Sequence, residues 1–233
     1  MKRILSTFII AILSVGALNA QNADQIANKF VKAIGAEKWR SIENSRLTIS
    51  LKQSGFEIPG YIISTSNNQE RFELEFSGMK MVQATDGTTA WGMNQFQGQN
   101  APAKLEGEQA EQANEVQFLD EFLDYKKNGS TLTYEGEGTM DGKECHKLKL
   151  TSAKGKEEIH FMDKATGMRI ATSETVGGQE VVVIYGNYEE VEGMMMAKSL
   201  TQKMGGQEVF TINISKVEFN VELADDLFAF PGN

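Results

Sequence analysis

Most of this chain consists of short segments in which apolar and polar residues alternate, and glycine-containing pairs stand between them. A period of two is the pattern of β-strands that bury one face. Pairs such as Asp-Gly and Gly-Gly between such segments are typical of tight hairpin turns. The predicted strands are residues 46–52, 58–64, 71–76, 81–85, 88–93, 131–134, 143–151, 157–163, 168–175, 180–188, 194–204 and 208–221.

Helical spacing replaces this alternation in three places. Residues 22–34 repeat apolar side chains every four positions, and a shorter stretch over residues 37–42 carries Trp39. Residues 108–127 predict a longer helix with a wide apolar face, and the glutamine- and glycine-rich residues 95–102 predict a loop before it. The apolar face of the longer helix includes Val116, Leu119, Phe122 and Leu123.

These elements predict a fold that is mainly β with helices, in the α+β class. The few predicted helices are not enough to cover one whole face of so many strands, although an alternating sheet needs a partner for its apolar face. A strongly curved antiparallel sheet that forms a half-open barrel, with helices over its mouth, satisfies this need. We therefore expect one domain over residues 21–233 with an apolar cavity between sheet and helices.

The first twenty residues have the pattern of a secretory signal peptide. Lys2 and Arg3 precede an apolar run over residues 5–13, and small residues lead to cleavage sites after Ala17 or Ala20. No cysteine follows the apolar run, so we expect a released chain rather than a lipid-anchored one. Cys145 is the single cysteine, which leaves no intramolecular disulfide for an exported protein.

Charge and motifs argue against several functions. The formal net charge of −9 disfavours nucleic acid and electrostatic adhesion to anionic lipid. His146 and His160 are the only histidines, and neither stands at a spacing typical of metal ligands. No nucleophile elbow or glycine-rich phosphate loop is present. We therefore expect no catalytic residues, no metal and no cofactor, and a non-enzymatic function.

The number and placement of the apolar residues favour a binding function instead. Eleven methionines lie mostly in or beside predicted strands, where flexible thioethers suit either an irregular apolar ligand or an ordinary core. We expect a cavity and lid lined by one face of two strands, by Trp91 and by the predicted helix. This expected lining is Leu47, Ile49, Leu51, Phe72, Leu74, Phe76, Trp91, Val116, Leu119, Phe122 and Leu123.

Several segments together resemble one known family. They are residues 32–38, 71–75, 82–91, 141–150, 162–168 and the tail over residues 219–231. Their order and spacing resemble the LolA-like outer-membrane lipoprotein-sorting proteins, and more closely the Bacteroidetes-type members. The resemblance implies a half-barrel whose cavity carries lipoprotein acyl chains through the periplasm. In the family an arginine on an early strand latches the lid. Arg71 is the best match, although here it precedes Phe72, whereas the familiar carriers have Phe before Arg.

The resemblance and the residues together predict a monomeric periplasmic carrier of acylated lipoproteins, which receives its cargo from an inner-membrane donor and delivers it to an outer-membrane acceptor. One alternative is a non-catalytic structural or protein-interaction domain of the cell envelope with a filled core, and another is a binder of a different hydrophobic ligand. A hydrolase of envelope lipid is a further alternative, and its activity would depend on His146 or His160.

Overall fold

The computed structural model describes residues 22–232, so the predicted signal segment lies outside the described residues. All of the strands described form a single antiparallel sheet. They are β1 (Asn44–Gln53), β2 (Phe56–Thr65), β3 (Glu70–Phe76), β4 (Met79–Thr85), β5 (Ala90–Asn94), β6 (Gln99–Lys104), β7 (Thr131–Met140), β8 (Lys143–Thr151), β9 (Glu157–Asp163), β10 (Arg169–Val176), β11 (Gln179–Val191), β12 (Met194–Met204) and β13 (Gln207–Phe219).

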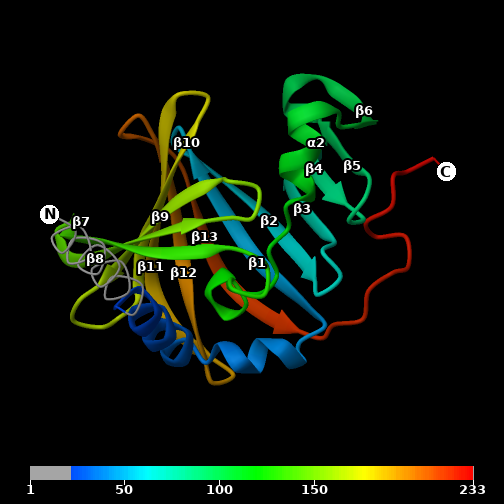
Figure 1. Cartoon of the computed structure of the whole chain (residues 1–233). Coiled ribbons are helices and arrows are strands. Elements are labelled where there is room, and N and C mark those ends of the chain that lie inside the picture. Colours follow the sequence, from blue (N-terminus) through cyan, green and yellow to red (C-terminus); the bar gives the residue numbers. More distant parts are fainter. Residues whose placement is uncertain (1–21, 233) are drawn as a thin grey trace, which may run out of the picture.

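The sheet consists of two meanders joined at its middle. Across the sheet, the strands run from β6 back to β1, then from β13 back to β7. The joint is the antiparallel pairing of β1 with β13, from Ser45 opposite Phe219 to Lys52 opposite Thr211. Strands β6 and β7 are therefore the two edges, and the sheet does not close on itself. The predicted half-open barrel of an α+β chain is confirmed (Figure 1).

Tight turns build each meander, as the glycine pairs predicted. Between β7 and β8, Asp141 and Gly142 have φ angles of 50° and 74°. Two successive left-handed residues are the mark of the hairpin turn whose twist matches that of the strands it joins. Asp and Gly are residues that adopt this conformation at low cost, so the local sequence fixes the register of the hairpin.

The described part of the chain contains few helices, and they are short. A helix covers residues 22–33, followed by the 3₁₀ helix η1 (Ala36–Ser41). The helix α2 (Gly107–Asn114) follows β6, and the 3₁₀ helix η3 (Glu121–Leu123) precedes β7. Within residues 22–232, no helix combines the length and the hydrophobicity needed to cross a bilayer.

Two expectations about this region are wrong. The predicted helix over residues 108–127 ends at Asn114, and Asp120 caps the separate 3₁₀ helix η3: its Oδ1 accepts a hydrogen bond from the Phe122 backbone N–H at 3.0 Å. Short carboxylates compete with helical hydrogen bonds in this way. The predicted loop over residues 95–102 contains the 3₁₀ helix η2 (Gln95–Gln97) and the start of β6, which pairs with β5.

The two faces of the sheet carry separate cores. On the inner face, the helix over residues 22–33 and η3 pack on β7–β9 through Phe30, Phe122 and Leu148. A second inner cluster lies on β1–β4 and β13 and includes Ile49 and Leu74. On the outer face, the C-terminal residues after β13 lie against β3–β5 (Figure 1).

A glycine in β2 provides a test of how closely the backbones of β2 and β3 approach each other. A Cβ built on Gly60 in β2 would lie 2.1 Å from the Glu73 backbone oxygen and 2.7 Å from the Leu74 side chain. We predict that Gly60→Ala lowers the free energy of unfolding by about 1–3 kcal/mol, because the backbone of β3 must move.

Gly186→Ala is the matched control, since its nearest neighbour would be the Ser199 Cβ at an ordinary 3.7 Å. We expect this variant to stay within about 0.5 kcal/mol of wild type in urea unfolding. Equal stabilities of the two variants would contradict the close approach at Gly60.

Candidate functional site

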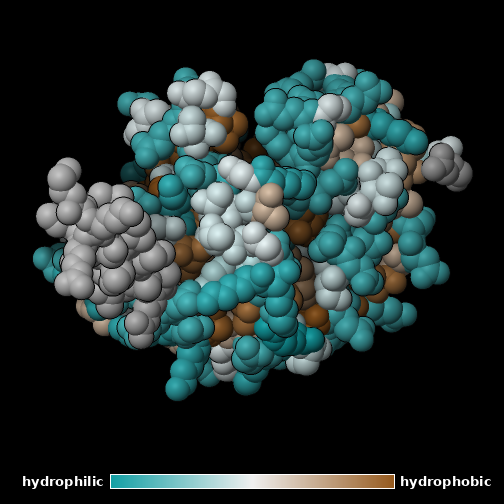
Figure 2. Space-filling model, viewed as in Figure 1, coloured by the Kyte–Doolittle hydropathy of each residue, from teal (hydrophilic) through white to brown (hydrophobic). Residues whose placement is uncertain are grey.

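A cavity of about 420 Å³ lies between the sheet and the segments that cover it. Its apolar lining comes from the N-terminal helix and η1, from β1, β12 and β13, and from the chain after α2. These residues are Phe30, Ile34, Trp39, Leu47, Phe118, Leu119, Met195, Met196, Ala197, Leu200 and Ile214. Apolar surface is also visible in the middle of this side of the molecule, between hydrophilic rims (Figure 2).

Residues 115–124, called the crossing segment below, cover this cavity. The segment runs from the end of α2 toward β7, on the inner side of the sheet (Figure 1). Phe118 packs edge-on against Trp39 with ring centroids 5.8 Å apart, and Trp39 packs likewise against Phe219 at 5.4 Å. Phe122 packs against Phe30 at 6.0 Å. Aromatic side chains therefore dock the crossing segment at two points.

A buried arginine on the sheet holds the middle of the crossing segment. Arg169 of β10 is 7% exposed, and its Nη1 lies 3.1 Å from Asp120 Oδ2 while its Nη2 lies 3.0 Å from Glu121 Oε1. Its guanidinium carbon also lies 4.8 Å from the ring centre of Phe30 and 5.0 Å from that of Phe122. Arg169 therefore contacts both the covering segment and the N-terminal helix.

Electrostatics keep this arginine charged. Burial lowers the pKa of Arg169, but the facing carboxylates of Asp120 and Glu121 outweigh burial and raise it. Burial raises the pKa of Glu121 to about 7, with Arg169 opposing that shift and Glu158 adding to it. The cavity wall thus combines acyl-compatible side chains with a concentrated, partly compensated group of charges.

A surface ion pair holds the end of the crossing segment. Arg40 donates to Asp124 with its Nη1 at 2.6 Å and its Nη2 at 3.2 Å, and its Nε reaches Glu37 at 2.8 Å. Just beyond the segment, Tyr125 donates a hydrogen bond to Asp24 of the N-terminal helix. Exposed pairs of this kind are individually weak, so the buried contacts of Arg169 are the stronger attachment.

The structure brings many of the predicted lining residues to the inner face, but not into one cavity. Leu47 and Leu119 line the cavity, and Phe122 and Leu123 pack in the core beside it. Val116 lines a neighbouring hollow of about 400 Å³. The others belong to the second inner cluster: Ile49, Leu51, Phe72 and Leu74. Phe76, at the end of β3, is 43% exposed.

Trp91 lies on the opposite face. It pairs with Ala84 of β4, which pairs with Arg71, so all three side chains are on the outer side of the sheet. Its indole N–H donates to the Phe228 backbone oxygen at 3.0 Å, and its ring packs against Phe230. Trp91 is thus an anchor for the C-terminal residues and does not face the cavity.

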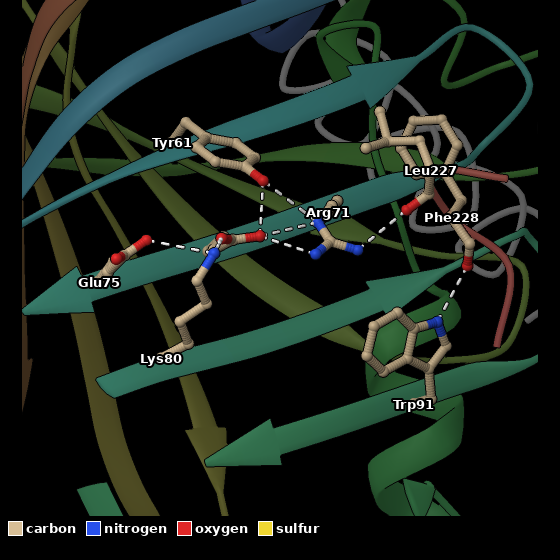
Figure 3. A network of polar contacts seen from close by, with 8 residues as sticks. Tyr61, Arg71, Glu75, Lys80, Trp91, Leu227 and Phe228 are labelled. Atoms are coloured by element: carbon tan, nitrogen blue, oxygen red, sulfur yellow. Dashed lines mark hydrogen bonds and ion pairs between the residues drawn. The ribbon is translucent and has the colours of Figure 1, made fainter. Parts of the chain in front are cut away.

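Arg71 contacts the C-terminal residues and not the crossing segment (Figure 3). Its Nη1 donates to the Leu227 backbone oxygen at 3.0 Å, and its Nη2 lies 2.7 Å from Glu73 Oε2. The expected latch position is therefore wrong for Arg71, because neighbours on a strand face opposite sides and Phe72 takes the inner one. The residue that does hold the covering segment, Arg169, was missed because Arg169–Ser173 has no apolar–polar alternation to mark its faces.

Glu73 is the centre of the outer-face network, because Tyr61, Arg71 and Lys80 all donate to its carboxylate. Besides Arg71, it accepts hydrogen bonds from the Tyr61 hydroxyl at 2.6 Å and from Lys80 Nζ at 2.9 Å. Burial raises the pKa of Glu73, but the hydrogen bonds from Tyr61, Lys80 and Arg71 outweigh burial and bring it to about 2. The carboxylate is therefore held ionised where the C-terminal residues meet β3.

One group of described side chains has the geometry to hold a metal ion. Glu121 of η3, with Glu158 and His160 of β9, places its potential ligand atoms within 4.8 Å of one another. His146, the other histidine, contacts Tyr134 and Glu137 instead and is not part of this group.

The open half-barrel with its covered inner face is a LolA-like fold. The sequence segments that resemble the LolA-like family predicted this fold. The chain is similar to a putative outer membrane lipoprotein-sorting protein domain from Vibrio parahaemolyticus, with a TM-score of 0.60 and 13% identity over 91% of this chain and 97% of the other. It is also similar to a LolA superfamily protein from Nitrosomonas europaea, with a TM-score of 0.55 and 13% identity over 88% and 96% of the two chains.

A DUF1329 family protein from Desulfovibrio piger is similar as well, with a TM-score of 0.58 and 16% identity over 90% of this chain and 97% of that chain. No family model matches the sequence, and no curated protein matches it. At these identities the comparisons establish the fold, which is that of lipoprotein-sorting and LolA superfamily proteins.

The attachment of the crossing segment can be tested by removing the charge of Arg169. We predict that Arg169→Gln destabilises this attachment by about 2–4 kcal/mol, because Asp120 and Glu121 lose their buried partner. Hydrogen exchange measured by mass spectrometry should become faster in residues 117–123 while the central strands stay protected.

Arg40→Gln is the control, since it removes an exposed pair from the same segment. It should change exchange in residues 117–123 much less than Arg169→Gln does. Unchanged protection in Arg169→Gln would show that the aromatic contacts alone hold the segment.

The outer-face network predicts a pH-dependent stability. The pKa of Glu73 in the folded protein, about 2, lies below its usual 4.5, so its contribution is complete above pH 4.5 and is lost as the pH falls toward 2. We expect Glu73→Gln to cost about 1–3 kcal/mol at neutral pH and progressively less below pH 4.5.

Glu75→Gln serves as control, because Glu75 is more exposed and pairs with Lys80 alone. Urea unfolding of wild type and both variants between pH 7 and pH 2.5 measures the difference. A cost of Glu73→Gln that stays constant over this range would contradict the low pKa.

Proposed function

We propose that this protein is a periplasmic carrier that binds the acyl chains of lipoproteins inside its half-barrel. The observation that supports this best is the cavity of about 420 Å³ beneath the crossing segment, which contributes no strand to the sheet. The crossing segment is the proposed lid, and Arg169 is its proposed latch. The similar Vibrio protein, a putative outer membrane lipoprotein-sorting protein domain, is consistent with this function.

The inner face offers enough apolar surface for acyl chains. The cavity lining continues across Leu47 and Ile214 into the second inner cluster, where Ile58, Ile62 and Phe72 are only partly buried. Each methylene removed from water contributes about 0.8 kcal/mol, so partial burial of one or two acyl chains supplies firm binding. This continuous apolar face is also the reason to favour a carrier over an envelope interaction domain with a filled core.

A carrier must also release its cargo, and the lid provides a means. Asp120, Glu121 and Arg169 stand at the cavity wall, so an acyl chain that enters must displace or pass a group of charges. Opening the lid exposes these charges to water, and closing it pairs them again. In the proposed cycle, contact with an inner-membrane donor or an outer-membrane acceptor shifts the equilibrium between the open and the closed lid. The protein travels between donor and acceptor as a monomer.

The cavity can be tested by filling it. Ala197 lines the cavity, whereas Ala101 is exposed on the edge strand β6. We predict that Ala197→Phe weakens binding of a fluorescent triacylated lipopeptide about tenfold or more, because the ring occupies space that the acyl chains need. Ala101→Phe adds the same side chain to the surface and should bind as wild type does.

Competition with free fatty acid, phospholipid and unacylated peptide identifies which part of the probe is bound. Competition by acylated peptide above all others supports a lipoprotein carrier. Better competition by phospholipid would assign another hydrophobic ligand. No binding to any acylated probe by delipidated protein would end the carrier proposal in favour of an interaction domain.

A further inference from the structure

His160 is a buried polar side chain that makes no hydrogen bond within the described chain. It is 0% exposed, and neither ring nitrogen makes a hydrogen bond. A buried imidazole without partners is costly, because both of its polar atoms have lost their water. The ring stacks at a tilt on Phe122 with centroids 4.7 Å apart, which fixes its position but satisfies neither nitrogen.

The unpaired ring faces two carboxylates. His160 Nδ1 lies 3.4 Å from Glu121 Oε1, and the potential ligand atoms of His160, Glu121 and Glu158 all lie within 4.8 Å of one another. The β8–β9 register places His160 opposite Leu148 and Glu158 opposite Leu150, so both side chains project from the inner face. Glu121 approaches the same point from the crossing segment.

The charges around this point do not balance. Asp120, Glu121 and Glu158 bring three carboxylates to the cavity wall, and Arg169 is paired with the first two of them. Lys156 is paired with Glu174 at 2.8 Å. When the carboxylates are ionised, the group therefore lacks about two positive charges, which is the charge of one divalent cation.

We propose that Glu121, Glu158 and His160 form a binding site for a divalent transition-metal ion of the Zn²⁺ type. One imidazole nitrogen with two carboxylate oxygens is a ligand set that suits Zn²⁺ and leaves a position for water. Burial and the charge of Arg169 lower the pKa of His160 well below its usual value, which keeps the ring neutral as a ligand must be. Ca²⁺ and Mg²⁺, which prefer oxygen ligands alone, fit less well.

The site stands on its own geometry and does not depend on the carrier function. Its ligands come from two parts of the fold: Glu121 belongs to the crossing segment, whereas Glu158 and His160 belong to the sheet. A bound ion would therefore tie the segment to β9 in addition to the contacts of Arg169. As the ion binds, the crossing segment should become more protected from hydrogen exchange.

The test uses the purified protein, stripped with EDTA and desalted, and titrated with ZnCl₂ in a calorimeter. Wild type should bind one Zn²⁺ per chain. His160→Gln and Glu158→Gln should each weaken binding about tenfold or more. His146→Gln is the matched control, because it alters the other histidine, outside the group, and should bind as wild type does. CaCl₂ should not compete.

Hydrogen exchange supplies a second readout. Zn²⁺ should slow exchange in residues 117–123 of wild type and of His146→Gln, but not of Glu121→Gln or His160→Gln. If His160→Gln does not fold, Glu158→Gln and Glu121→Gln carry the test. Absence of stoichiometric Zn²⁺ binding by wild type, or undiminished binding by the Glu158 and His160 variants, would overturn the proposal.

Discussion

The pairing of β1 with β13 determines the shape of the molecule. It joins the beginning of one meander to the end of the other, so β6 and β7 become opposite edges of one sheet. These edges are consecutive in the chain, and the residues between them must therefore pass from one side of the open barrel to the other. The crossing segment lies over the inner face for this topological reason, before any particular side chain is considered.

The buried charges fix the position of the crossing segment over the inner face. Aromatic contacts such as Phe118 with Trp39 tolerate small shifts of the segment, whereas the paired contacts of Arg169 with Asp120 and Glu121 require one position. Charges inside the cavity are also screened little by salt. The same group of side chains therefore holds the proposed lid, opposes the entry of an acyl chain and contributes to the proposed metal site.

Strand alternation made the sheet and much of its inner face predictable, including Leu47, Ile49, Leu51, Phe72 and Leu74. It failed for Trp91 because a single segment does not show which of its faces is the inner one; that depends on pairing with Ala84 and Arg71. A single helix over residues 108–127 is not formed, because Asp120 caps the separate 3₁₀ helix η3 with its side chain instead of continuing a helix. Within the group around His160, Glu158 lies two residues away on the same strand, but Glu121 comes from the distant crossing segment, so the sequence could not show that the three meet.

The central joint also sets the order in which the protein folds. Each meander can form by successive neighbouring hairpins, but β1 finds its second partner only when β13, the last strand, is available. Long-range pairing of this kind is slow, because a large loop must close before the contacts are gained. Until then, the apolar face of the first meander is uncovered and the β1 edge is free to pair with another chain. Pairing of the last strand therefore protects the β1 edge from other chains as well as completing the sheet.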